Sequence, residues 1–151
     1  MPLIPLTTLT LLATHGLHQS YQNITRLLTY EHQSEKAAKW SNKASQRLHK
    51  TRSTQTSGTV TLLISLLSSL YLLFYIYSPK PPTPYLLPLL SLLNTLLLLL
   101  SHHHMSQFWN PRTQVEIPMV EKFNEAIRGS EAVVRVLGFM GGVWGVCLGV
   151  W

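Results

Sequence analysis

The chain contains no aspartate and a single cysteine, and charged residues make up only 12% of its 151 positions. Soluble domains carry about 25% charged residues, so this chain has about half of the charge expected of one. A single cysteine excludes an intrachain disulfide framework. The shortage of charge argues against a soluble enzyme, whose surface needs more charged groups. The charge that is present is mostly basic, with 12 Lys and Arg against 6 Glu.

Apolar residues are gathered in blocks, two of which carry no charge. The first block, 59–78, has 20 residues, and the second, 85–101, has 17 residues of which 11 are leucine. A membrane-spanning helix needs about 17–25 apolar residues. The connection 79–84 contains four prolines, which cannot continue a helix. Region 59–101 is therefore predicted to form a transmembrane helical hairpin.

A third apolar block, 132–151, contains one charge, Arg135, and five of the eight glycines. We expect a Gly-rich C-terminal helix that either forms a third span or packs obliquely on a partner. Four glycines recur at steps of 4, 3 and 4, which places them on one helical face: Gly138, Gly142, Gly145 and Gly149. Glycines at such spacing let another helix approach closely in lipid. The block is predicted to dock on another helix, and the alternative is a loosely packed apolar tail.

Small and polar residues inside the hairpin predict helix-packing contacts. Thr61, Ser65 and Ser69 recur every four residues in the first block, and Asn94 lies near the middle of the second. A polar side chain within the membrane is costly unless it has a partner. We expect these four residues to contact other helices, and Asn94 to serve packing rather than a substrate.

The region before the hairpin divides into an uncharged segment, 1–19, and a basic segment, 20–58. The apolar run 3–12 is too short to span a membrane, and we expect the first segment to lie in an interface. The second is predicted to be one amphipathic helix with a basic stripe at steps of 3, 4, 4 and 3, joined to the first span at Gly58. The stripe consists of Lys36, Lys39, Lys43, Arg47 and Lys50. It favours anionic phospholipid, for example cardiolipin, or an acidic partner. An ordinary solvated face is the alternative, and nucleic acid is not expected.

Charge distribution predicts the orientation. Residues 1–58 contain seven basic side chains, whereas the turn of the hairpin contains only Lys80. The positive-inside rule then places the N-terminal arm in the cytosol or the matrix. The segment 102–131, predicted to contain a short amphipathic helix, lies on the same side. No basic or Arg-rich presequence pattern begins the chain, so we expect targeting by internal segments.

The most conspicuous candidate for chemistry is the run His102, His103 and His104. Neighbouring side chains on a helix point about 100° apart and do not converge on one ion, and no further metal-ligand motif accompanies them. No nucleophile elbow, phosphate loop or dinucleotide motif occurs. We therefore expect no catalytic residue, no cofactor and no metal. The rival hypothesis is a membrane-bound enzyme of lipid metabolism that uses the three histidines.

The order of a charged helical segment followed directly by a transmembrane hairpin resembles the small accessory membrane subunits of mitochondrial respiratory complex I, of the fungal NUXM type. The resemblance covers residues 20–101 and concerns layout, since no specific motif carries it. It implies the mitochondrial inner membrane, with the N-terminal arm in the matrix. It also implies other transmembrane subunits as partners, and a role in assembly or stability. The alternative from another class is an endoplasmic-reticulum assembly or membrane-shaping factor, with its arm in the cytosol.

Overall fold

The computed structural model describes residues 3–80, 83–116 and 121–150, and four helices account for most of them. They are α1 (Leu3–Ala38), α2 (Asn42–Ile76), α3 (Leu86–Phe108) and α4 (Glu121–Val150). No strand occurs in these described ranges. Three helices, α2, α3 and α4, are long and apolar enough to cross a membrane. The predicted all-α membrane fold is therefore confirmed.

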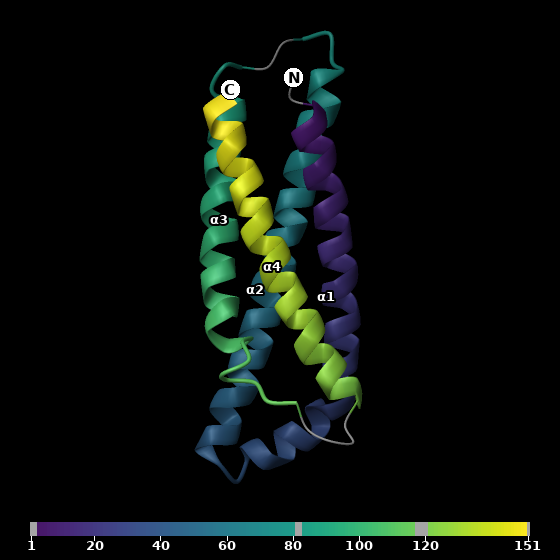
Figure 1. The fold of residues 1–151 in the computed structure, drawn as a ribbon, viewed down its shortest axis with the longest axis vertical. Helices are drawn as coiled ribbons and strands as arrows, with labels where there is room; N and C mark the ends of the chain where they lie inside the picture. The colour runs from purple at the N-terminus through teal and green to yellow at the C-terminus, as the bar shows by residue number, and fades with distance from the viewer. Residues whose placement is uncertain (1–2, 81–82, 117–120, 151) are drawn as a thin grey trace.

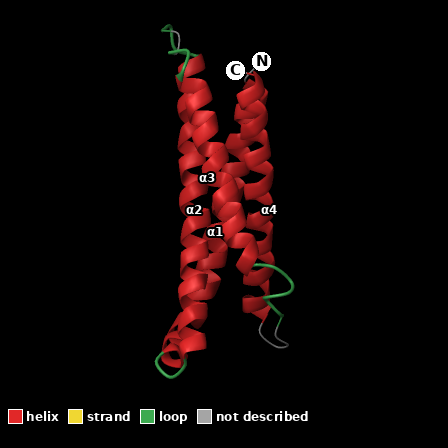
Figure 2. Cartoon of the chain, turned by 90° about the vertical axis from the view of Figure 1, so that its left-hand side faces the viewer, coloured by secondary structure: helices red, strands yellow, loops and turns green. Residues whose placement is uncertain are grey.

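The helices form an elongated bundle in which the chain runs up and down (Figure 1). Helix α1 packs against α2 and α4, and α3 packs against α2 and α4. Both chain ends lie at the end of the bundle that holds the α2–α3 connection, and the α1–α2 turn lies at the opposite end (Figures 1 and 2). At about 1.5 Å per residue, α1 and α2 are each about 50 Å long, which exceeds the roughly 30 Å of a bilayer core.

Side-chain placement on α3 is inverted relative to a soluble protein. The residues that face the bundle include Ser91, Asn94 and Ser101, all buried. The exposed positions are leucines at Leu89, Leu92, Leu93, Leu96, Leu99 and Leu100. Water would favour the opposite arrangement, because leucine burial is favourable and serine burial is not. Lipid favours the observed one, since polar groups then find partners inside the protein.

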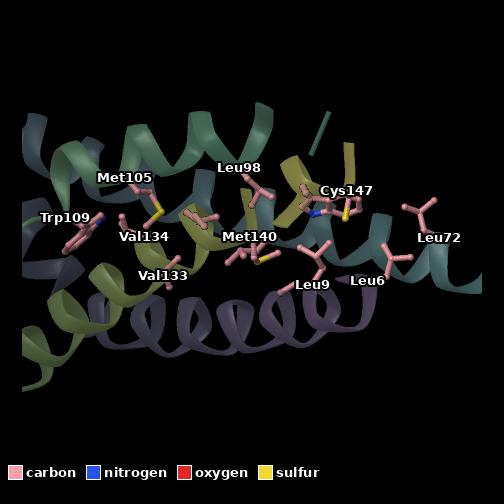
Figure 3. Packing of buried hydrophobic residues seen from close by; sticks show 14 of the residues in the cluster. Leu6, Leu9, Leu72, Leu98, Met105, Trp109, Val133, Val134, Met140 and Cys147 are labelled. Atoms are coloured by element: carbon pink, nitrogen blue, oxygen red, sulfur yellow. The ribbon is translucent and has the colours of Figure 1, made fainter. Parts of the chain in front are cut away.

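The apolar core runs along the bundle axis between the four helices. At the end that holds both termini, Leu6 and Leu9 of α1 lie near Leu72 of α2 (Figure 3). Trp144 of α4 is the largest of the fully buried side chains among the described residues. The N-terminal third of the chain therefore contributes directly to the core of the bundle.

The predicted boundary at residue 19/20 is wrong, because α1 continues from Leu3 to Ala38 without a break. The sequence 3–12 is not an isolated interfacial segment, because Leu6 and Leu9 are fully buried, as is Ala13 directly after it. Gly16 lets α1 approach α2 and α4, since a β-carbon there would lie 3.0 Å from a methyl of Leu62 and 3.3 Å from one of Val136.

The prediction of a single basic helix over 20–58 is also wrong. The chain leaves α1 after Ala38 and enters α2 at Asn42, with Ser41 as the N-cap in an extended conformation. The hydroxyl of Ser41 accepts a hydrogen bond from the backbone N–H of Ala44 (3.5 Å). An N-cap serine of this kind starts a new helix and lets the chain reverse.

Gly58 is not a joint, because α2 passes through it without interruption. A β-carbon at Gly58 would lie 2.5 Å from the sulfur of Met105, so the glycine permits close packing of α2 on α3. The division at residue 131/132 is likewise absent, since α4 is continuous from Glu121 to Val150. Helix α3 extends past Ser101 to Phe108. The short amphipathic helix expected within 102–131 coincides with the first turns of α4, which is described from Glu121 onward.

Candidate functional site: an outer ridge of α4 and a cavity at the basic end

The small residues predicted on α2 are buried inside the chain itself. Ser65 accepts a hydrogen bond from the indole N–H of Trp144 on α4 (2.8 Å). Ser69 accepts one from the hydroxyl of Thr10 on α1 (3.0 Å). Thr61 is 7% exposed. This face of α2 therefore joins three helices of the protein.

Asn94, the amide predicted near mid-span, is 1% exposed and faces the bundle. Its Nδ2 donates to the carbonyl of Leu90 in its own helix (2.9 Å). A hydrogen bond within the helix removes part of the cost of placing an amide in lipid.

The glycines of α4 do not all face the same way. Gly138 accommodates the imidazole of His102, and Gly141 accommodates Leu99, with a β-carbon expected at 3.1 and 3.2 Å from these side chains. Gly145 lies beside Thr95. Gly142 and Gly149 are exposed, and a β-carbon on either would meet none of the described residues within 4 Å. The glycine stripe predicted from periodicity is therefore divided: Gly138 and Gly145 face α3, whereas Gly142 and Gly149 lie on the outer surface of α4.

Gly142 and Gly149 are seven residues apart, or two helical turns, so they share a face. The exposed apolar side chains on that face are Phe139 (62%), Val146 (66%) and Val150 (65%). We call these five residues the outer ridge of α4.

The three consecutive histidines point to separate partners. Nδ1 of His102 lies 2.9 Å from the carbonyl of Val134 and carries the hydrogen, because a carbonyl can only accept. His103 lies 3.0 Å from the amide of Gln107, and His104 lies 3.1 Å from the hydroxyl of Ser53. No group of three or more His, Cys or Glu side chains that could hold a metal ion occurs within 3–80, 83–116 and 121–150.

The basic stripe is divided among three elements. Lys36 lies in the last turn of α1, Lys39 lies in the turn, and Lys43, Arg47 and Lys50 lie on α2. All five side chains are exposed. The regular spacing therefore spans a chain reversal and does not describe one helical face.

Ion pairs at this end connect α1 to its neighbours. Arg52 of α2 pairs with Glu31 and Glu35 of α1, and Arg26 of α1 pairs with Glu125 of α4 (3.2 Å). The hydrogen bonds of Arg52 to Glu31 and then Glu35 raise the pKa of its guanidinium, which lies outside the apolar block 59–78. Segments 26–52 and 110–128 hold seven and three Lys and Arg, so ten of the twelve basic residues lie at this end.

A cavity of about 360 Å³ opens between the helices at the same basic end. Apolar side chains from all four helical regions line it, namely Ile24, Leu27, Leu48, Phe108, Trp109 and Phe123. Gln55, Arg47 and Arg52 also line it. Sequence reasoning missed this cavity, because its walls meet only after the chain reverses between α1 and α2.

The comparisons with known proteins give no relative: no protein-family model, no curated protein and no solved structure matches this chain.

Proposed function

We propose that this protein is a non-catalytic subunit of a larger membrane complex, which it joins through the outer ridge of α4. The observation that carries the proposal is the exposure of Gly142 and Gly149 among Phe139, Val146 and Val150. Glycine lowers helix stability by about 1 kcal/mol relative to alanine, so its presence needs a packing reason. Gly138, Gly141 and Gly145 have such a reason inside the chain, whereas Gly142 and Gly149 have none among the described residues.

Contact with a transmembrane helix of another subunit would explain why positions 142 and 149 are glycine. Small residues allow two backbones to approach closely in lipid, where packing rather than hydrophobic transfer drives association. The neighbouring Phe139 and Val146 would then flank the crossing point. Arg135, one helical turn before Phe139 and also exposed, offers a cation to an acidic group of the partner.

For the identity of the complex, our proposal is mitochondrial respiratory complex I in the inner membrane, with the basic end in the matrix. Support comes from the layout of a charged helical region followed by a hairpin, and from the concentration of basic residues at one end of the bundle. The competing assignment is an endoplasmic-reticulum assembly or membrane-shaping factor. Separation of the two organelles by fractionation of a tagged protein distinguishes these assignments.

The outer ridge is tested by the substitution Gly142→Leu. A β-carbon at this exposed position would meet none of the described residues within 4 Å, so the isolated protein should keep its stability. It would nevertheless fill the space that a partner helix needs. We expect the apparent affinity for the heterologous subunits, measured from the fraction that co-migrates with them on a native gel, to fall about tenfold, which corresponds to about 1.4 kcal/mol.

Gly141→Leu is the matched control. Gly141 is the residue next to Gly142 but faces inward, where a β-carbon would lie 3.2 Å from a methyl of Leu99. This variant should lose stability as an isolated chain. Gly142→Leu should keep its stability and lose only its incorporation into the complex. Normal incorporation of Gly142→Leu into the complex would refute the outer ridge as the docking surface.

A further inference from the structure

The cavity at the basic end has the composition of a binding site for an amphiphile. Its volume of about 360 Å³ is at the lower end of the range of about 300–1,000 Å³ for small-molecule sites. Such a volume accommodates one slender chain rather than a whole two-chain lipid. Most of its wall is aliphatic or aromatic, and its polar groups come mainly from one face of α2.

Gln55 supplies a hydrogen-bond acceptor without a partner. It is 5% exposed, and its Nε2 donates to the hydroxyl oxygen of Ser130 (2.7 Å). The hydroxyl hydrogen of Ser130 is donated to the carbonyl of Ala126 (2.7 Å), so Ser130 can only accept from Gln55. This fixes the orientation of the amide, and Oε1 is the atom that has no hydrogen-bond partner in the described part of the chain.

An unpaired buried acceptor costs about 1–3 kcal/mol, so a ligand that brings a donor recovers this energy. A hydroxyl group is such a donor, whereas a carboxylate or a phosphate diester is not. Gln55 therefore selects for a hydroxyl on the molecule in the cavity.

Arg47 supplies a cation two helical turns away on the same face of α2. Among the described residues its Nη2 makes two long contacts, 3.5 Å to the carbonyl of Thr113 and 3.4 Å to Oε1 of Gln114. No carboxylate of the described residues pairs with it, in contrast to Arg52, which Glu31 and Glu35 neutralise. A phosphate accepts strong, often bidentate hydrogen bonds from arginine.

The order of these groups along α2 sets the direction of the ligand. Arg47 lies nearest to the turn at the basic end, and Gln55 lies about 12 Å further along the helix, toward the apolar block. A ligand that follows this order has a phosphate at the outer end, a hydroxyl next to it and an apolar chain among Ile24, Leu27 and Phe123.

We propose that the cavity binds a single-chain lipid phosphate with a free hydroxyl beside the phosphate, as in a monoacylglycerol phosphate. Arg47 binds the phosphate, Oε1 of Gln55 accepts from the hydroxyl, and the acyl chain occupies the apolar part. The site lies within one chain, so it does not depend on the subunit role proposed above.

The experiment uses the full-length protein in detergent micelles and counts bound lipid by native mass spectrometry during titration. The probes are monooleoylglycerol phosphate, its analogue without the glycerol hydroxyl, monooleoylglycerol without phosphate, and inorganic phosphate. We expect saturable binding of the first probe at one per chain. The deoxy analogue and the phosphate-free lipid should each bind about tenfold more weakly, and inorganic phosphate should not bind measurably.

Two variants assign the contacts. Gln55→Met keeps the side-chain length and removes the acceptor, so the preference for the hydroxylated probe over its deoxy analogue should disappear. Arg47→Gln should weaken phosphate binding about tenfold. Lys43→Gln, which removes the same charge one turn away and outside the cavity lining, should leave it unchanged.

Several outcomes would overturn the proposal. One is equal binding of the hydroxylated and deoxy probes to the unsubstituted protein. This comparison does not depend on whether any variant folds. Another is an equal loss in Lys43→Gln and Arg47→Gln, which would indicate unspecific attraction to a basic surface. Absence of saturable binding would mean that the cavity is filled by water or by a partner's side chain.

Discussion

Replacing Trp144 with alanine is expected to lower the free energy of unfolding of the isolated bundle by about 3–5 kcal/mol, the usual cost of removing a buried tryptophan. Trp144 is fully buried between the helices, and its indole N–H donates to Ser65 across the α2–α4 contact. The substitution leaves a void in which neighbouring side chains lose their dispersion contacts. It also leaves Ser65 without this donor. Reversible unfolding in mixed detergent micelles, followed by circular dichroism, measures the change.

Two controls separate the packing of Trp144 from its hydrogen bond. Trp144→Phe keeps most of the ring and removes the donor, so a smaller loss of about 1–2 kcal/mol is expected. Trp40→Ala removes a tryptophan that is 91% exposed and should change stability by less than about 0.5 kcal/mol. Equal effects of Trp144→Ala and Trp40→Ala would show that α4 does not pack in the bundle as described.

The second large effect concerns the side of the membrane on which α1 begins. Helix α1 packs along α2 and α4 over the bundle, so Leu3 and Ser41 lie at opposite ends. We therefore expect α1 to cross the membrane together with α2. In a Cys147→Ala background, a membrane-impermeant maleimide should label Leu3→Cys and Ser78→Cys from one side and Ser41→Cys from the other, in an all-or-none manner.

Labelling of Leu3→Cys and Ser41→Cys from the same side would contradict this arrangement. That result would restore the simpler prediction from the sequence, in which the whole N-terminal arm lies on the basic side. Ser78→Cys is the internal reference, because it belongs to the connection between α2 and α3.

Hydropathy was sufficient to locate α2, α3 and α4, whereas α1 is not among the described helices that are apolar enough to span a membrane. Hydrogen bonding within α1 bears on our prediction that it crosses nevertheless. The first 25 residues contain no charge but include several threonines. Thr7, Thr8 and Thr14 donate their hydroxyl hydrogens to carbonyls about one turn earlier, at distances of 2.8–2.9 Å. A hydroxyl paired in this way costs less in lipid than its polarity suggests. Scales that score residues singly do not include such pairing.

The site was predicted less well than the spans, because its residues meet only through tertiary structure. The stripe from Lys36 to Lys50 has regular helical spacing, yet Ser41 starts a new helix within it. The glycine pattern of α4 could not distinguish inward-facing Gly141, where a β-carbon would lie 3.2 Å from Leu99, from outward-facing Gly142. The pairing of Gln55 with Ser130 joins residues 75 positions apart, so no local pattern reveals it.

The burial of Asn23 bears on whether this residue can be glycosylated. Asn23, Ile24 and Thr25 match the N-glycosylation pattern Asn-X-Ser/Thr. Asn23 is fully buried, however, and a β-carbon at Gly129 would lie 2.0 Å from its Oδ1. An asparagine inside the folded bundle is not accessible for modification, whichever side of the membrane it faces. Gly129 is therefore needed to make room for Asn23 between α1 and α4.

The most direct test of the proposed subunit role is the size and composition of the particle that contains the protein. Membranes that carry a tagged chain are extracted in mild detergent, separated on a native gel, and the band is analysed by mass spectrometry. We expect a particle much larger than the 17.1 kDa chain, with a constant set of heterologous membrane subunits. Migration as a single chain, or as a homo-oligomer without any stable partner, would contradict the account.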